Sequence, residues 1–244
     1  MPRVNETGSV GNDKWRTPRP LAKWLRETYR LDLDLCADVD SAVCKSYICA
    51  HEDESIDDQE RGIYCVAVDA LNVSLQHINR CRSFMNFPYS DPPRWLNLAH
   101  EIRNAGGYVI ALMPHDTSAP WYSDHVFGVA DEILMIIGRV SFELPPDATC
   151  KRGGFSKPSA LAIYDGSRAF TSTEYKLLQV PDTFRGLRRN AIDWPKEPII
   201  WSADSCKATT EVGAICATSP CPHLGLHPKY FAWVEAQRAQ KARV

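Results

Sequence analysis

The sequence predicts an α/β domain with a mostly parallel sheet, and three observations carry this prediction. Short apolar runs have the length of buried strands, and they occur at residues 64–68, 82–85, 108–113, 132–137 and 161–164. Stretches with apolar residues at helical spacing alternate with these runs, as in proteins built from strand–helix–strand units. Three polar residues (Asp34, Asp69 and Asn86) fall at or just past the ends of expected strands, where ligands bind in such sheets.

Each expected element has its own signal in the chain. The stretch 21–31 follows two prolines and repeats its apolar residues at helical spacing, which predicts an amphipathic helix with proline in its first turn. Residues 31–38 alternate apolar and acidic side chains, as a strand does. The acidic stretch 51–60 predicts a surface loop. A further helix is expected at 95–104, because Ala105-Gly106-Gly107 supplies a stop signal.

The domain limits are predicted from where the alternation of strands and helices begins and ends. We expect a flexible N-terminus at 1–13, the α/β domain at 14–166 and a less regular C-terminal extension at 167–244. A loop rich in proline and glycine is expected at 144–159, and a short helix near the end of the extension at 227–243.

Composition indicates an ordinary soluble globular protein. Of the 244 residues, 44% are hydrophobic and 24% are charged, and no apolar run approaches the roughly 20 residues of a membrane span. The first residues lack the apolar core of a signal peptide, so we expect a cytoplasmic protein. The net charge of -2 does not favour nucleic-acid binding unless basic residues cluster on one face. Candidate clusters are Lys151, Arg152 and Lys157, and Arg185, Arg188 and Arg189.

The nine cysteines indicate thiols rather than a disulfide framework. Their number is odd, and a chain of this length needs no disulfide for stability, so most should be reduced and buried. Near the C-terminus, Cys206, Cys216, Cys221 and His223 lack the paired Cys-x-x-Cys units of a zinc site. The sequence therefore predicts no metal.

The segment Asn86-Phe87-Pro88-Tyr89-Ser90 carries the clearest chemistry. An amine whose lone pair is delocalised into a purine ring becomes more nucleophilic when it donates hydrogen bonds. The oxygen of Asn86 and the carbonyl of Phe87 are suitable acceptors, and Pro88 holds the loop extended. Tyr89 could stack on a base swung out of the duplex. A simple surface turn is the alternative, since Asn, Pro and Ser favour turns.

This loop, with Trp95 shortly after it, resembles the Asn-Pro-Pro-Tyr-Ser catalytic motif of the phage-type DNA adenine-N6 methyltransferases. Five other segments resemble family elements in the same order, over residues 13–165: Asp13 to Pro18, Leu33 to Ala37, Asp69 to Leu71, Leu112 to Pro114 followed by Trp121, and Gly138 to Phe142.

The resemblance implies a Rossmann-like S-adenosylmethionine-dependent methyltransferase sheet with helices on both faces. It implies site-specific methylation of a flipped-out adenine in double-stranded DNA and a bacteriophage origin, with action in the host cytoplasm if the chain is phage-encoded. The sequence itself shows no evident obligate protein partner. The implied catalytic residues are Asn86, Phe87, Pro88 and Tyr89. The implied cofactor residues are Trp15, Thr17, Pro18, Asp34, Cys36, Ala37 and Asp69. We also expect DNA contacts at Ser90 and, from the clustered positive charge of the expected loop, at Lys151, Arg152 and Lys157.

One departure from the family pattern bears on activity. Phe87 stands where the family has its first proline, but its carbonyl remains and Pro88 still restrains it, so we expect activity to persist in a reduced or retuned form. The common Gly-x-Gly nucleotide turn is absent after the first strand, and the resemblance implies that small residues such as Cys36 and Ala37 serve instead. Two alternatives stay open: the same chemistry on an amine of RNA or protein, and a catalytically weak DNA-binding phage protein.

Overall fold

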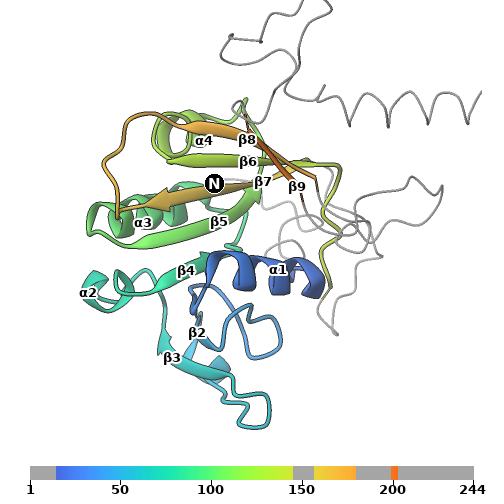
Figure 1. Ribbon diagram of the computed structural model, residues 1–244. Coiled ribbons are helices and arrows are strands. Elements are labelled where there is room, and N and C mark those ends of the chain that lie inside the picture. Colours follow the sequence, from blue (N-terminus) through green and yellow to red (C-terminus); the bar gives the residue numbers. More distant parts are fainter. Residues whose placement is uncertain (1–14, 145–156, 180–198, 203–244) are drawn as a thin grey trace, which may run out of the picture.

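A computed structural model describes residues 15–144, 157–179 and 199–202, and within them nine strands form one sheet (Figure 1). Their order is β3-β2-β1-β4-β5-β7-β6-β8-β9. The strands are β1 (Leu33–Asp34), β2 (Ser46–Cys49), β3 (Tyr64–Val68), β4 (Arg82–Met85), β5 (Tyr108–Pro114), β6 (Glu132–Ile137), β7 (Ser159–Asp165), β8 (Glu174–Gln179) and β9 (Ile199–Ser202). The helices are α1 (Arg19–Tyr29), α2 (Leu75–Ile78), α3 (Pro92–Asn104) and α4 (Pro120–His125), with a 3-10 turn at Glu52–Glu54.

The first five strands are parallel and follow the Rossmann order, which reverses direction between β1 and β4. Strand β7 runs antiparallel to both β5 and β6, and β8 pairs with β6 in parallel. The mixed α/β fold predicted from the sequence is therefore confirmed.

Helices cover both faces of the sheet. Successive residues of the central strands point to opposite faces, and the apolar ones on each face pack against a helix. On β4, Phe84 packs in one cluster with Leu21 and Leu25 of α1. Its neighbour Met85 packs in the other cluster, with Leu96 of α3. The central strand β5 is buried along all seven residues, as expected for a strand covered on both sides.

Some strands and helices differ from those predicted, in length, in presence or in their first residue. The expected strand at 31–38 is only two residues long, because the Asp34 carboxylate accepts a hydrogen bond from the Cys36 backbone N–H and turns the chain. Strands β2, β8 and β9 and helix α2 were not predicted. Helix α3 begins at Pro92, three residues earlier than expected.

The sheet continues past residue 166, where we expected the domain to end, since β8 and β9 extend it. The domain limits remain a prediction. Several expectations concern residues outside the described ranges. They are the flexible N-terminus at 1–13, the helix at 227–243, the cluster of Arg185, Arg188 and Arg189, and the group of Cys206, Cys216, Cys221 and His223. No helix in the described part of the chain is long and apolar enough to cross a membrane.

One buried ion pair joins helix α3 to the sheet. Arg103 donates two hydrogen bonds to Asp131, of 2.7 and 2.9 Å, and the side chains are 12% and 4% exposed. Asp131 also accepts the backbone N–H of Asp165 at 2.8 Å. This carboxylate therefore ties α3, the start of β6 and the end of β7 together.

Candidate active site

A cavity of about 510 Å³ opens where the strand order reverses, at the carboxyl ends of β1 and β4. Its volume lies in the range of small-molecule sites, and its position is the one at which ligands bind in open α/β sheets. It is lined by Trp15, Arg16, Thr17, Asp34, Leu35, Cys36, Ala37, Asp38, Ser41, Ile48, Cys49, Ala50, His51, Glu54, Asp69, Ala70, Asn86, Pro88, Arg94 and Trp95.

Asn86 follows β4 directly, and its amide is held at both ends. Its Nδ2 donates to the backbone carbonyl of Trp15 at 2.8 Å. Its Oδ1 accepts from the hydroxyl of Tyr89 at 3.2 Å, and the same hydroxyl lies 3.4 Å from the carbonyl oxygen of Leu112. An amide oxygen has two lone pairs, so Oδ1 can accept a second hydrogen bond in this orientation.

Residues 15–18 form an entry segment that leads from the cavity into α1. Arg16 and Glu143 exchange backbone hydrogen bonds of 2.8 and 2.9 Å, and the Glu143 carboxylate accepts the Arg19 N–H at 2.9 Å. The rings of Trp15 and Phe142 lie 5.7 Å apart. The segment after β6 thus fixes the place of the Trp15 carbonyl beside Asn86.

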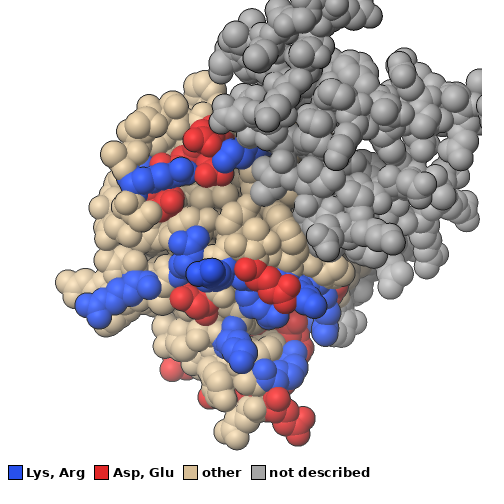
Figure 2. All heavy atoms as spheres, in the orientation of Figure 1, with Lys and Arg blue, Asp and Glu red and all other residues tan. Residues whose placement is uncertain are grey.

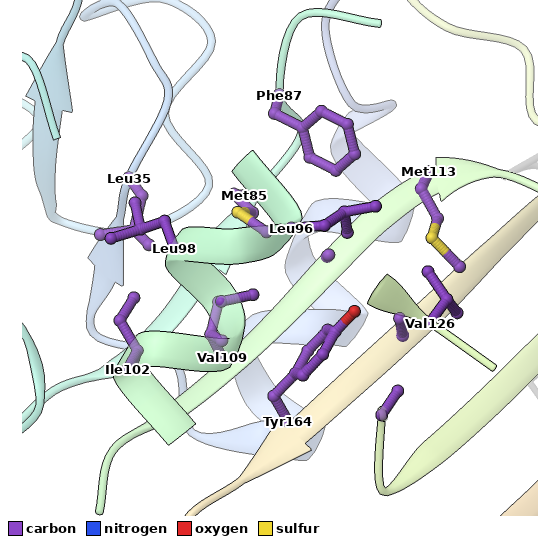
Figure 3. Packing of buried hydrophobic residues seen from close by; sticks show 14 of the residues in the cluster. Leu35, Met85, Phe87, Leu96, Leu98, Ile102, Val109, Met113, Val126 and Tyr164 are labelled. Atoms are coloured by element: carbon purple, nitrogen blue, oxygen red, sulfur yellow. The ribbon is translucent and has the colours of Figure 1, made fainter. Parts of the chain in front are cut away.

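Phe87 is a core residue, 2% exposed, and lies at one end of the cluster between α3 and the sheet (Figure 3). Its ring meets that of Tyr89 edge to face, with centroids 5.7 Å apart, and Tyr89 meets Phe142 in the same way at 6.2 Å. Burial raises the pKa of the Tyr89 hydroxyl far above its usual value, so it stays a donor. The rings of Phe87 and Tyr89 do not line the cavity.

Asp34 is buried against the cavity wall, with 2% of its surface exposed. Its carboxylate accepts backbone hydrogen bonds from Val43 at 2.9 Å and Cys36 at 3.2 Å. Burial raises the pKa of Asp34 to about 7 although these two hydrogen bonds oppose it, and the nearby Asp38 raises it further. Asp34 therefore shapes the turn after β1 and changes charge near neutral pH.

Asp69 follows β3 in a left-handed conformation, with φ of 54°. Its carboxylate accepts hydrogen bonds from Asn72 at 2.6 Å and from the Leu71 backbone at 3.2 Å. Its own backbone N–H donates to the Cys49 carbonyl at 2.8 Å. This turn places the residue after β3 beside the end of β2 on the cavity wall.

The cavity brings together most residues that the sequence singled out. Of the expected catalytic and cofactor residues, Asn86, Pro88, Trp15, Thr17, Asp34, Cys36, Ala37 and Asp69 line it. Pro18 is buried at the start of α1 and does not line it, and Ser90 is exposed beyond the loop. The roles of all these residues remain predictions.

The expected DNA-contacting lysines give little support for a basic surface. Lys157 pairs with Asp116, whereas Lys151 and Arg152 lie outside the described residues. Basic and acidic side chains are mixed over the face seen in Figure 2. Across the described residues, no three His, Cys, Asp or Glu side chains gather as metal ligands.

Sequence reasoning missed several charged residues on the cavity wall. Glu54 and His51 lie in a stretch expected to be a plain surface loop, and Arg16, Asp38 and Arg94 were not singled out. An available signal was the short apolar run at 47–50, which marks β2 and puts His51 and Glu54 just past a strand end.

The fold and the cavity define an α/β protein with a ligand site at the point where the order of its parallel strands reverses. The chain belongs to the DNA N-6-adenine-methyltransferase (Dam) family, whose model matches residues 5–181. It is therefore an enzyme that methylates adenine in DNA. The family supports this reading over the two alternatives, an amine of RNA or protein as substrate and a catalytically weak DNA-binding phage protein.

The chain was also compared with solved structures and with curated protein sequences. A provisionally assigned RNA methyltransferase from Pyrococcus horikoshii, known from a crystal structure, is 15% identical, with a TM-score of 0.39 over 67% of this chain and 91% of that chain. A comparison with curated protein sequences gives no match.

Proposed function

We propose that the cavity binds S-adenosylmethionine and that Asn86 activates an adenine drawn out of double-stranded DNA. The single observation that carries this proposal is the position of the Asn86 amide. It lies on the cavity wall, with its nitrogen engaged by Trp15 and its oxygen able to accept one more hydrogen bond.

The lining fits a cofactor with a cationic sulfonium group and a nucleoside part. Acidic side chains line the cavity at Asp34, which ends β1, at Asp69, which follows β3, and at Glu54, in the 3-10 turn after β2. Glu54 lies 20 residues after Asp34, and an acidic residue at about this distance commonly accepts hydrogen bonds from a ribose. Apolar groups such as Ile48 and the small residues Cys36 and Ala37 leave room for an adenine ring.

When bound, S-adenosylmethionine supplies an electrophilic methyl group. The chain contributes positioning and hydrogen bonding rather than a covalent intermediate. The Asn86 oxygen and the Phe87 carbonyl accept the two N–H groups of the adenine amine. This would localise the lone pair on the nitrogen. The nitrogen could then take the methyl group as the bond from that carbon to the sulfonium sulfur breaks, which would release S-adenosylhomocysteine and, afterwards, one proton to water.

The role of Tyr89 differs from simple stacking in this proposal. Its hydroxyl holds the Asn86 amide and its ring is packed between Phe87 and Phe142. We assign it first to positioning Asn86. Stacking on the flipped base would require the Tyr89 ring to move towards the cavity, which it does not line.

The test uses methyl-labelled S-adenosylmethionine with duplex DNA, single-stranded DNA, RNA and protein as separate substrates. We expect label only on DNA, strongest on the duplex, and recovered as N6-methyladenine after digestion to nucleosides. Asn86→Ala should lose about 10²–10³-fold in rate, the usual cost of removing one polar transition-state contact. It should keep its cofactor affinity by calorimetry.

Asn97→Ala is the matched control, because Asn97 lies exposed on α3, where its amide donates a hydrogen bond to Glu101 one turn along the helix. It should methylate like the native chain. Equal loss in both variants, or label on RNA or protein instead of DNA, would refute the proposal.

A further inference from the structure

A pair of thiols lies beside the cavity, on strands β2 and β3, which β1 separates from the strand that leads to Asn86. Cys49 ends β2 and Cys65 lies on β3, and their sulfur atoms are 3.3 Å apart. This is closer than two sulfur atoms approach without a hydrogen bond or a bond between them. Cys49 is 1% exposed and lines the cavity, whereas Cys65 is half-buried and in reach of small solutes.

The strand pairing explains how the two side chains meet. Tyr47 is opposite Cys65 and Ile48 is opposite Ala67, so Val66 is an extra residue on β3. Such a bulge bends its strand and alters where the neighbouring side chains point. Both sulfur atoms lie near the Ala67 carbonyl oxygen, at 3.7 Å for Cys49 and 3.3 Å for Cys65.

The two thiols are chemically unequal. Burial raises the pKa of Cys49, and its contact with Cys65 raises it further. Burial also acts against ionisation of Cys65, but hydrogen bonds with Ser55 and Cys49 bring the pKa of Cys65 below its usual value. A more acidic, accessible thiol beside a less acidic, buried one is the arrangement of an attacking and a resolving cysteine.

We propose that Cys49 and Cys65 are a peroxide-reactive dithiol that closes reversibly to a disulfide on the cavity wall. The Cys65 sulfur attacks one oxygen of hydrogen peroxide and the O–O bond breaks. Cys65 becomes a sulfenic acid, and the other oxygen leaves as water with the proton of the Cys65 thiol. The Cys49 thiol then attacks that sulfur, and a second water leaves with the Cys49 proton. Two thiols are oxidised, and one peroxide is reduced to two waters.

Closing the bond requires the sulfur atoms to approach from 3.3 Å to about 2.05 Å. Strand β3 can follow, because it is an edge strand with β2 as its one neighbour in the sheet order. The motion reaches the cavity through the hydrogen bond from the Asp69 N–H to the Cys49 carbonyl. Oxidation should therefore change the methylation rate, and only this last consequence rests on the proposed function.

The test treats the reduced native enzyme with a few equivalents of hydrogen peroxide, alkylates the remaining thiols and maps the peptides by mass spectrometry. We expect one linked peptide pair, joined through Cys49 and Cys65 and released by dithiothreitol. The yield of this linked pair should be more than ten times the yield of any disulfide-linked peptide that contains Cys36, Cys44 or Cys81. The same sample should show at least a threefold change in methylation rate that dithiothreitol restores.

Cys65→Ser should abolish both the link and the rate change. Cys81→Ser is the matched control, since Cys81 is also a half-buried thiol, and it should behave like the native chain. Recovery of Cys49 and Cys65 as alkylated thiols, or of Cys65 as a sulfinic acid without a linked peptide, would overturn the dithiol. A linked peptide with an unchanged rate would overturn its coupling to the cavity.

Discussion

The side-chain nitrogen of Asn86 donates a 2.8 Å hydrogen bond to the backbone carbonyl of Trp15, a residue 71 positions earlier. This contact decides which end of the amide is free for substrate. If the amide were reversed, two oxygens would face each other and the nitrogen would meet the Tyr89 hydroxyl. The contact therefore distinguishes asparagine from its closest isostere, aspartate.

Asn86→Asp should lose at least tenfold in methylation rate, about 1.4 kcal/mol. A carboxylate is a good acceptor, but one of its oxygens would face the Trp15 carbonyl with no hydrogen to donate. The loss should deepen as the pH rises and the carboxyl ionises, which a rate profile between about pH 5 and 9 measures. Native rates at every pH would show that the Trp15 contact has no orienting role.

Tyr89→Phe should slow methyl transfer by about five- to tenfold, since a net hydrogen bond contributes about 1 kcal/mol. The aromatic packing on Phe87 and Phe142 would persist. Cofactor affinity should not change, because Tyr89 does not line the cavity. Single-turnover rates and calorimetry separate the two effects, with Tyr64→Phe on the exposed edge strand as the control.

Phe87→Pro restores the family's proline but removes a ring from the core. We expect the free energy of unfolding to fall by about 3 kcal/mol, the usual range for losing a buried phenylalanine. Where both proteins are folded, the variant should methylate at least as fast as the native chain. Denaturant unfolding and a rate assay on the same sample test this. Phe127→Ala, at a 61% exposed position, should leave stability nearly unchanged.

Asp34 should make stability depend on pH. Its pKa in the folded protein is about 7, against 3.8 as the model-compound value. A raised pKa means that the folded state binds the proton more tightly, so its contribution is full below about pH 4 and is lost as the pH rises towards 7. The native chain should lose up to about 1.4 kcal/mol per pH unit in this window relative to Asp34→Asn. The comparison cancels other titrating groups such as His115, and a constant difference would argue against the shift.

Arg103→Ala should destabilise the fold by about 3–5 kcal/mol, since it leaves the Asp131 carboxylate buried without its partner. Lys23→Ala removes the exposed pair between Lys23 and Glu27 on α1 and should cost less than about 1 kcal/mol. Thermal unfolding of both variants provides the comparison. Equal effects would mean that Arg103 is more solvated than its 12% exposure indicates.

The sequence predicts the long, strongly apolar elements well and the short ones poorly. Strands β5 and β6 stand out because a run such as Tyr108–Pro114 is buried on both faces and needs no polar residue. Strand β2, with Ser46 and Cys49 at its ends, shows no alternation, and its one signal is a short apolar run at 47–50 that is too brief to stand out. It forms because β1 and β3 pair with it on either side.

The site follows the same division. Residues at strand ends, such as Asp34 and Asn86, could be predicted because a parallel sheet gathers its carboxyl ends at one edge. The contact between Asn86 and Trp15 could not, because it depends on how the entry segment is placed by Glu143, in a different part of the chain. Phe87 could not be interpreted from the motif alone. The structure shows its ring packed in the core between α3 and the sheet, and a motif does not describe such packing.

The pairing of Arg16 with Glu143 also sets an order of events during synthesis. Chains emerge from the ribosome N-terminus first, so the first residues of the site leave the tunnel long before their anchor. Until residue 143 is available, the two backbone hydrogen bonds that hold Arg16, next to Trp15, cannot form. We therefore expect a nascent chain to complete the surroundings of Asn86 only after Glu143 has left the tunnel.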